Sequence, residues 1–296
     1  MWVIKYRKIF YTFSLLLVII SVVALSMWGV KPGIDFTGGT LVEMSYPDGR
    51  PEQSVIAAKL AAIDPAASIR PTGTDGYIVR MKPIEQGEKP AITAALTLDG
   101  SLNAVEKNFS SIGPVLGSEA LRKSIWSIVL VVVAIVLFIT FAFRKVSEPV
   151  SSWKYGFAAI VALAHDVIIP TGVFAILGHF LGYEVDTLFV TALLVVLGFS
   201  VHDTIVVFDR VRENLHTQSQ KPFTEVVGSS VSQTFTRSIN TSLTTLIALV
   251  VLYILGGSTT EHFSLVLIVG IAAGTYSSIF IGSPLLVTMA QWSKKK

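Results

Sequence analysis

The run IFYTFSLLLVIISVVALSMWGV, residues 9–30, contains 22 residues without a charged side chain. About 20 predominantly apolar residues are enough for an α-helix to cross the hydrocarbon core of a bilayer. Three basic residues precede the run, as in a secretory signal, but the apolar part of such a signal has only about 7–15 residues. We therefore expect a first transmembrane helix that remains part of the protein.

Five further stretches predict helices of the same kind. Three of them are essentially apolar, and two contain a His-Asp pair within an otherwise apolar run. They are Ser124–Phe143, Tyr155–Tyr183, Thr187–Phe208, Ser238–Thr260 and His262–Trp292. The whole chain of 296 residues has 15% charged residues and a mean hydropathy of +0.66, whereas soluble domains carry about 25% charged residues. The sequence therefore predicts an integral membrane protein with six transmembrane helices.

The composition excludes several classes of function. The chain has no cysteine, which rules out disulfides, thiolate metal sites, iron–sulfur ligation and a thiol nucleophile. Its net charge is only +3, so a dispersed nucleic-acid-binding surface is not expected.

Basic residues predict the orientation in the membrane, because short loops rich in Lys and Arg stay in the cytoplasm. The short loops near 182–186 and 257–261 contain neither residue. The basic residues outside residues 31–123 lie before span one, between spans two and three, between spans four and five, and at the end of the chain: Lys5, Arg7, Lys8, Arg144, Lys145, Lys154, Arg210, Arg212, Lys221, Arg237 and Lys294–Lys296. We expect both termini in the cytoplasm and residues 31–123 outside it.

Residues 31–123 predict a small α+β domain. Strands are expected at Gly39–Tyr46, Ser68–Pro71, Tyr77–Met81 and Asn103–Ile112, and helices at Glu52–Ile63 and Ala91–Leu98. The order β-α-β-β-α-β is typical of the ferredoxin-like fold. The segment GIDFTGGT, residues 33–40, has the glycine spacing of a phosphate-binding loop, but Gly39 stands where the lysine that contacts phosphate would be. A tight turn before the first strand is the better interpretation.

Four stretches carry a resemblance to a known family. GIDFTGGT follows the first span as it does in the SecD and SecF subunits of the bacterial Sec translocon, and three later stretches resemble SecF-type proteins in particular. These are AHDVIIPTGVFAILG at 164–178, VHDTIVVFDRVREN at 201–214 and TRSINTSLTTL at 236–246. The resemblance covers the whole chain. It implies an accessory membrane subunit of protein export, related to resistance-nodulation-division transporters.

The same resemblance implies partners and an energy source. Members of this family pair with SecD and use the proton motive force to assist preprotein translocation through SecYEG. The expected location is the bacterial inner membrane, crossed several times. The domains are expected at 1–30 (N-terminus and first span), 31–123 (periplasmic domain) and 124–296 (five spans, with a cytoplasmic segment at 209–237).

Two carboxyl groups lie within predicted spans, where a charge costs roughly 2.5–3.5 kcal/mol at the bilayer centre. Asp166 lies 12 residues after Lys154, roughly 18 Å along the helix and near mid-bilayer. It is either a buried carboxyl that holds helices together or part of a proton relay, and the sequence leaves both open. Asp203 lies nearer the cytoplasmic end.

For Asp203 a proton-relay role is favoured. Arg237 opens span five, and Asn240, Thr241 and Thr244 continue its helical face. So many polar groups on one span must face protein or water. A carboxylate, a guanidinium and a polar lining are the parts of a proton path, because a nearby cation lowers a carboxyl pKa and desolvation raises it. The resemblance independently implicates Asp203 and Arg237 in proton transport, and it expects a further acidic residue from a SecD span.

The remaining polar residues predict no chemistry. His165 and His202 point about 100° away from the neighbouring aspartates, so packed or hydrogen-bonded imidazoles are favoured over proton relays. No metal site, cofactor or catalytic set is predicted, and we expect no enzyme activity. Residues 209–230 should extend span four and then lie along the membrane surface, as a linker or as a contact with partners. The alternatives to proton-driven export are a passive translocon scaffold and half of an exporter of small molecules or lipids.

Overall fold

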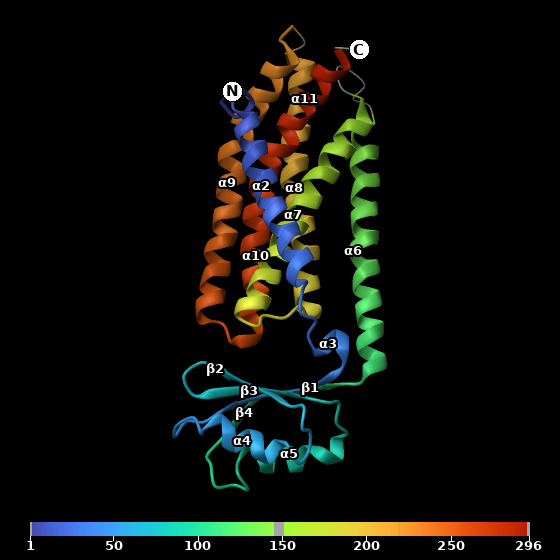
Figure 1. Ribbon diagram of the computed structural model, residues 1–296. Helices are drawn as coiled ribbons and strands as arrows, with labels where there is room; N and C mark the ends of the chain where they lie inside the picture. The colour runs from blue at the N-terminus through green and yellow to red at the C-terminus, as the bar shows by residue number, and fades with distance from the viewer. Residues whose placement is uncertain (1, 145–150, 219, 295–296) are drawn as a thin grey trace. The chain divides into compact units, whose positions relative to one another are not determined.

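The computed structural model describes residues 2–144, 151–218 and 220–294 (Figure 1). Two compact units make up the chain. The helical unit comprises residues 1–31 and 126–296, and the sheet unit comprises residues 32–125. Of the basic residues used for the orientation, Lys145 and those at 295 and 296 lie outside the described residues.

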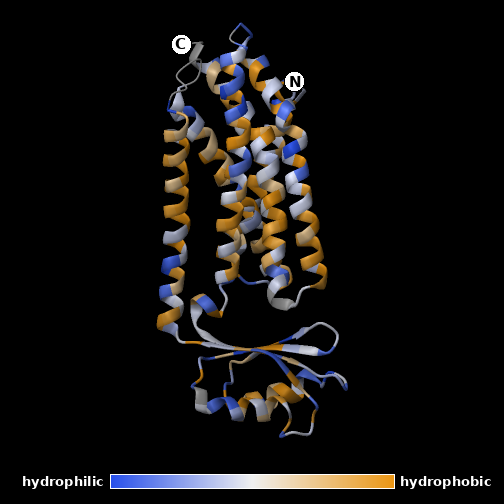
Figure 2. Cartoon of the chain, turned by 180° about the vertical axis from the view of Figure 1, so that it is seen from behind, coloured by the Kyte–Doolittle hydropathy of each residue, from blue (hydrophilic) through white to orange (hydrophobic). Residues whose placement is uncertain are grey.

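In the described part of the chain, six helices are long and apolar enough to cross a membrane, and they correspond to the six predicted spans. The protein is therefore a multi-pass membrane protein. Hydrophobic residues follow the length of these helices, and hydrophilic ones gather toward their ends (Figure 2). The helices are α2 (Arg7–Trp28), α6 (Pro114–Ala142), α7 (Ser152–Phe180), α8 (Thr187–Thr217), α9 (Phe223–Leu255) and the continuous helix formed by α10 (Ser258–Ser277), η2 (Ser278–Gly282) and α11 (Ser283–Lys294), with the short α1 (Trp2–Lys5) before them.

The helical unit has a central and a peripheral set of helices. In α7, α8 and the last helix, half or more of the residues in the most apolar 18-residue stretch are buried. In α2, α6 and α9, less than a fifth of the corresponding stretch is buried. The central contacts include Phe208 of α8, which meets Tyr155 of α7 edge-on with ring centroids 5.3 Å apart. The peripheral helices therefore keep apolar faces free for lipid or for another membrane subunit.

Helices α8 and α9 differ from the sequence-based expectation for residues 209–230. Helix α8 does extend beyond span four, to Thr217. Residues 223–237, however, begin α9, one helix of 33 residues that runs on through span five. Because a single helix has a single axis, its first half does not lie along the membrane surface while its second half spans. The prediction of a surface-lying segment was wrong.

The sheet unit is a four-stranded antiparallel sheet with two helices on one face (Figure 1). Its strand order is β2-β3-β1-β4, with neighbouring strands antiparallel throughout. The elements follow the predicted order and lie close to the predicted ranges. They are β1 (Gly39–Ser45), α4 (Gln53–Leu60), β2 (Ser68–Thr72), β3 (Gly76–Met81), η1 (Gln86–Glu88), α5 (Lys89–Leu96) and β4 (Val105–Ile112), preceded by the short α3 (Ile34–Thr37).

Alternation of side chains along the strands explains this arrangement. Val42 and Met44 of β1 point to the same face as Val79 of β3, because every second residue of a strand shares a face. They are buried together with Ile56 of α4 and Leu96 of α5. The apolar side chains on one face of the sheet thus pack against the two helices, and the side chains on the other face are more polar.

In the glycine-rich corner before β1, the backbone at Gly38 packs directly against the backbone at the start of α6, within the sheet unit. Gly38 has φ +74°, and a Cβ placed on it would lie 2.8 Å from the Cα of Pro114 at the start of α6. A Cβ on Gly117 would in turn lie 2.8 Å from the Gly38 nitrogen. Only glycine accommodates both the positive φ and this close approach. The tight-turn interpretation of residues 33–40 is consistent with this packing.

Candidate functional site

Asp166 is fully buried and joins three helices. Its Oδ2 accepts hydrogen bonds from the Ser200 hydroxyl of α8 at 2.5 Å and from the Ser277 hydroxyl of α10 at 2.8 Å. Its Oδ1 lies 2.8 Å from His165 Nδ1. Pro170, four residues later in α7, has no N–H to donate to the Asp166 carbonyl, so the regular helical bond is missing at this point. The missing bond concerns the main chain alone, and both oxygens of the Asp166 side chain have partners.

Asp203 has a different environment from Asp166. It is 7% exposed, and its Oδ1 accepts one hydrogen bond of 2.5 Å from the Ser238 hydroxyl of α9. Its Oδ2 is buried and has no hydrogen-bond partner among the described residues. An unpartnered oxygen on a buried carboxyl costs free energy that a cation, a water or a proton would recover. Asp203 is therefore the carboxyl group that is left incompletely satisfied.

Arg237 does not contact Asp203 in this conformation. The two side chains form no ion pair within 4 Å in the described part of the chain, and Arg237 is exposed. Its neighbour Ser238 takes the position facing the carboxyl. Consecutive helical residues point about 100° apart, so a helix that directs Ser238 inward directs Arg237 away.

The predicted polar lining lies on the same outward face as Arg237. Asn240, Thr241 and Thr244 are all exposed on α9. The inward face of α9 instead presents Ser238 and Ser242, which are 2% and 3% exposed. The structure thus brings Asp203 together with these two inward-facing serines and leaves the predicted polar lining without cover from the described residues.

Hydroxyl groups connect the surroundings of the two aspartates. The Thr204 and Ser278 hydroxyls lie 2.9 Å apart, and Ser278 also donates to the Ser200 carbonyl at 3.3 Å. Ser278 directly follows Ser277, the partner of Asp166. It begins the π-helical segment η2, and such π segments are frequent at functional sites. A row of buried hydroxyls therefore lies between Thr204, the residue after Asp203, and the carboxyl of Asp166. It is not one unbroken path of hydroxyl–hydroxyl bonds, because Ser278 donates to the backbone carbonyl of Ser200.

A second hydroxyl contact extends from the Asp203 side. Ser242, one turn after Ser238, lies 2.6 Å from the Thr275 hydroxyl of α10. Sequence reasoning missed Ser200, Thr204, Thr275, Ser277 and Ser278. A signal was present in the run GTYSS of span six, because small and hydroxyl-bearing residues in a transmembrane helix mark close helix–helix contacts.

The two histidines have unlike environments. His165 is 4% exposed and contacts Asp166 through Nδ1, whereas its Nε2 is buried without a partner among the described residues. His202 is exposed on α8. No group of three metal-ligating side chains was found in residues 2–144, 151–218 and 220–294.

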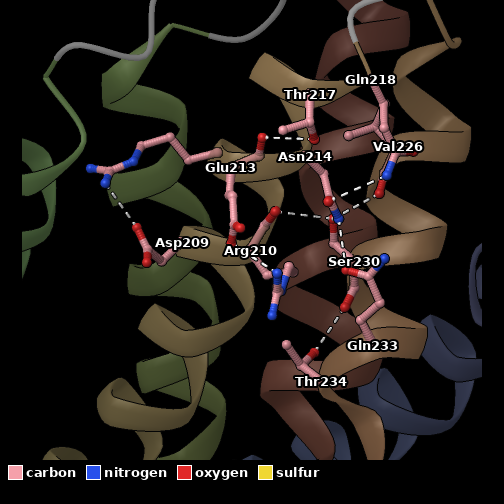
Figure 3. Close-up of polar contacts among 11 residues, drawn as sticks. Asp209, Arg210, Glu213, Asn214, Thr217, Gln218, Val226, Ser230, Gln233 and Thr234 are labelled. Atoms are coloured by element: carbon pink, nitrogen blue, oxygen red, sulfur yellow. Dashed lines mark hydrogen bonds and ion pairs between the residues drawn. The ribbon is translucent and has the colours of Figure 1, made fainter.

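A buried amide holds α8 against α9 near the loop that joins them (Figure 3). Asn214 of α8 is 5% exposed and donates to the Ser230 hydroxyl at 2.8 Å and to Gln233 Oε1 at 3.1 Å, both on α9. Gln218 donates to Asn214 Oδ1 at 3.3 Å. These bonds set how far one helix is shifted along the other, and so they help to place Ser238 opposite Asp203.

Comparison with known proteins connects this arrangement to one family. A family model described as "Protein export membrane protein SecD/SecF, C-terminal" matches residues 92–292, and one described as "SecD/SecF GG Motif" matches residues 29–46. The chain is 41% identical to the protein translocase subunit SecF of Thermobaculum terrenum, over 99% of this chain and 94% of that protein. It is 34% identical to the SecF of Sebaldella termitidis, over 98% of this chain and 92% of that protein.

Solved structures give the same result for the fold. The crystal structure of SecDF from Thermus thermophilus, described as a translocon-associated membrane protein, matches with a TM-score of 0.83 and 30% identity. That match covers 98% of this chain and 38% of the SecDF chain. SecDF in its super-membrane-facing form matches with a TM-score of 0.69, also at 30% identity, over 99% of this chain and 39% of the other.

Proposed function

Because the chain belongs to the SecD/SecF family of protein-export membrane proteins, we propose that it is an accessory subunit of the Sec preprotein translocase. In this role it pairs with SecD and uses the proton motive force to assist the passage of preproteins through SecYEG. It resides in the bacterial inner membrane with both termini in the cytoplasm. Its relatives with the name SecF support the export role.

The unsatisfied oxygen of Asp203 carries the proton-transport part of this proposal. A carboxyl inside a span is stable when it is protonated or when a cation faces it. Ser238 donates a hydrogen bond but brings no charge, and a buried carboxyl without a facing cation favours the protonated form. Arg237, the residue before Ser238, would suit the ionised form. A turn of α9 by about 100° exchanges the two, so that proton binding and release are tied to a helix movement.

In this proposal Asp166 holds helices together and is not part of the proton relay. Its carboxyl oxygens accept from two serines and face His165, so it gains little from exchanging a proton. The hydroxyl row through Ser278 links it to the Asp203 side. We assign Asp166 to holding α7, α8 and α10 together around that row.

The outward face of α9 supports pairing with SecD. Arg237, Asn240, Thr241 and Thr244 are polar, lie in a spanning helix and are exposed in this chain. Polar side chains in a span normally face protein or water. A SecD span covering this face would provide the missing surroundings and the second acidic group of the proton path. This chain matches only 38% of the length of the Thermus SecDF chain.

The sheet unit is assigned as a ferredoxin-like domain on the outer side of the membrane, at about residues 31–123. The strand order β2-β3-β1-β4 with two helices on one face supports this fold. The basic residues of the short loops support the orientation. Each proton crossing 100 mV supplies about 2.3 kcal/mol, enough to bias a movement that lets this domain hold an emerging preprotein.

Export of a secretory reporter in cells lacking the native subunit tests the proposal, with wild type compared to Asp203→Asn. Asparagine has nearly the same shape but carries no titratable proton. Asp209→Asn is the matched control, since Asp209 is exposed on the same helix and, among the described residues, pairs with its neighbour Arg212 at 3.1 Å. We expect the control to support export and Asp203→Asn to fail, with equal membrane abundance and SecD co-purification. Full export by Asp203→Asn would favour a passive scaffold instead.

A further inference from the structure

A groove in the helical unit lies between α2, α7 and the segment from η2 to α11, and it encloses a volume of about 490 Å³. Its lining is almost entirely apolar and includes Leu15 and Val18 from α2, Ile168 from α7, and Ile281 and Leu285 from the last helix. Helix α2 crosses α7 beside it (Figure 1). The volume falls in the size range of ligand pockets.

The packing of α2 against α7 explains why a groove is present. Gly172 of α7 lies so close to Ser21 of α2 that a Cβ on the glycine would overlap the serine side chain. Packed helices cross at an angle, so they diverge on either side of such a contact. Val18 and Ile168 precede this contact by about one turn on their helices. The groove therefore lies beside the crossing, toward the first turns of both helices.

The groove opens on the outer surface of the helical unit. Leu15, Ile160 and Ala164 line it and are exposed. Because this surface is formed by spanning helices, lipid chains are the molecules that reach the opening. The apolar lining offers a water molecule too few of the two to four partners that a buried water needs. Helix α9, which the proposed function places against SecD, contributes no residue to this lining.

Two lysines lie on the faces of α2 and α7 that line the groove. Lys8 precedes Tyr11 by three residues and Leu15 by seven, and residues so spaced share one face of a helix. Lys154 precedes Val161 by seven residues in the same way. Each lysine lies in the first turn of its helix.

Both lysines are at the same end of the groove. Ser21 lies against Gly172, and Lys31 further along α2 lies against Gly178 further along α7, so the two helices run in the same direction. Lys8 directly precedes the uncharged run 9–30, and the end of such a run is at the level of the lipid headgroups. The apolar groove thus begins below a pair of cations at the membrane surface.

The elements around the groove do not balance this positive charge. Helices α1 and α2 and the segment from η2 to α11 contain no Asp or Glu, and the one acidic residue of α7 is the buried Asp166. Arg7, next to Lys8, donates to Gln291 Oε1 at 2.7 Å and to the Ile4 carbonyl at 3.2 Å, which are neutral partners. An anionic headgroup complements such a surface.

We propose that the groove and the two lysines form a binding site for one anionic phospholipid. One acyl chain lies in the groove between α2 and α7, and the phosphate contacts Lys8 and Lys154. Basic residues between spanning helices are suited to such headgroups, and the long apolar part of a lysine side chain lets its ammonium reach the headgroup level. The lipid fills the space between the first span and α7. This proposal does not depend on proton transport.

Native mass spectrometry of the purified full chain tests the role of charge. The chain is titrated in mild detergent with dioleoylphosphatidylglycerol or dioleoylphosphatidylcholine, which have the same acyl chains and differ in net charge. We expect one phosphatidylglycerol to bind roughly 5- to 25-fold more tightly than phosphatidylcholine, since each lysine near a headgroup contributes about a factor of 5. Equal binding of the two lipids would overturn the proposal.

Charge variants locate the headgroup. Lys8→Gln and Lys154→Gln should each reduce the preference for phosphatidylglycerol by about 5-fold. Lys221→Gln is the matched control, because it removes the same charge from an exposed position between α8 and α9. We expect this control to keep the full preference. An equal loss in Lys221→Gln would mean a diffuse attraction to the whole surface and would overturn the site.

A second set of measurements locates the acyl chain. Ala164→Phe fills the groove at its exposed edge and should weaken the binding of both lipids. Ala134→Phe places the same side chain on an exposed part of α6 outside the lining and should leave binding unchanged. Dihexanoylphosphatidylglycerol, tested on the wild type, keeps the headgroup but has short chains, so it should bind more weakly than the dioleoyl lipid whether or not the Ala164 variant folds.

Three results would overturn the placement of the chain. The first is full binding by a folded Ala164→Phe variant. The second is binding of the short-chain lipid as tight as that of the dioleoyl lipid. The third is loss of the bound phospholipid when the chain is purified together with SecD, which would assign the groove to a helix of that partner.

Discussion

The Ser238 hydroxyl donates a 2.5 Å hydrogen bond to Asp203 Oδ1 and so joins α9 to α8 through a carboxyl inside the membrane. The two residues lie 35 positions apart in the chain. Because the other oxygen of Asp203 is buried and unpartnered in the described structure, this bond is what the carboxyl depends on in the present conformation.

Replacing Ser238 with alanine should leave both oxygens of Asp203 without a partner. We expect a loss of about 1–3 kcal/mol in unfolding free energy at neutral pH, with export reduced and not abolished, since the titratable group remains. Ser229→Ala is the control, because in the described structure that hydroxyl bonds to a carbonyl of its own helix. Thermal unfolding and reporter export check both; unchanged stability in Ser238→Ala would show that Asp203 has another partner.

Asp166→Asn and Asp203→Asn should have different effects: the first should lower stability and membrane abundance, and the second should lower export. Asp166→Asn turns an acceptor oxygen into a donor among two serines and His165, so we expect about 2–4 kcal/mol of destabilisation and reduced membrane abundance. Asp203→Asn should keep its abundance and lose export. Quantitative immunoblots of membranes beside the export assay separate the two. Normal abundance of Asp166→Asn with lost export would return Asp166 to the proton path.

Asn214→Ala should loosen the α8–α9 pair near residue 218. Its amide donates to Ser230 and Gln233, and its removal leaves buried groups unpaired, at a cost of about 1–3 kcal/mol. We expect faster proteolysis between the two helices and weaker export, because Ser238 is no longer held in register with Asp203. Thr217→Ala is the control, since Thr217 is exposed and, among the described residues, its hydroxyl bonds to its own helix.

Asp64 should make the stability of the sheet unit depend on pH. Its carboxyl accepts backbone N–H bonds from Lys82 at 2.7 Å and Ala66 at 3.0 Å, which lowers its pKa in the folded protein. The stabilisation is therefore present above the unfolded-state pKa of about 3.9 and is lost as the pH falls through the lower folded value. The protection of the Lys82 amide against hydrogen exchange, relative to the intrinsic rate at each pH, should fall below about pH 4 in wild type, and Asp64→Asn should lose that pH dependence.

Gly38→Ala should disrupt the corner that joins β1 to α6. The added Cβ would lie 2.8 Å from Pro114 Cα, and the positive φ adds strain of about 1–2 kcal/mol. Gly100→Ala is a matched control, because Gly100 has φ +83° with nothing within 4 Å of its Cβ position. We expect the first variant to be less stable by at least about 1 kcal/mol, measured by thermal unfolding. Equal losses in both would mean that only the φ angle matters.

The spans and strands were predictable because their signals are local. Residues 9–30 and 124–143 exceed the length needed to cross a bilayer whatever surrounds them, and the alternation in β1 and β3 reports a sheet with one buried face. The start of the helix that carries span five was not predictable in this way. Residues 223–237 already form the first turns of α9, ahead of its apolar run, where hydropathy gives no signal.

The sequence by itself determined that Asp166, Asp203 and Arg237 lie in or at the ends of spans, since charges are conspicuous in apolar runs. Only the tertiary structure decided their partners. Ser277 donates a hydrogen bond to Asp166, 111 positions away in the chain. The rotation of α9 about its axis places Ser238, and not Arg237, against Asp203. Such pairings depend on how helices turn about their axes, which is set by the packing of all their neighbours and leaves no periodic trace in any one of them.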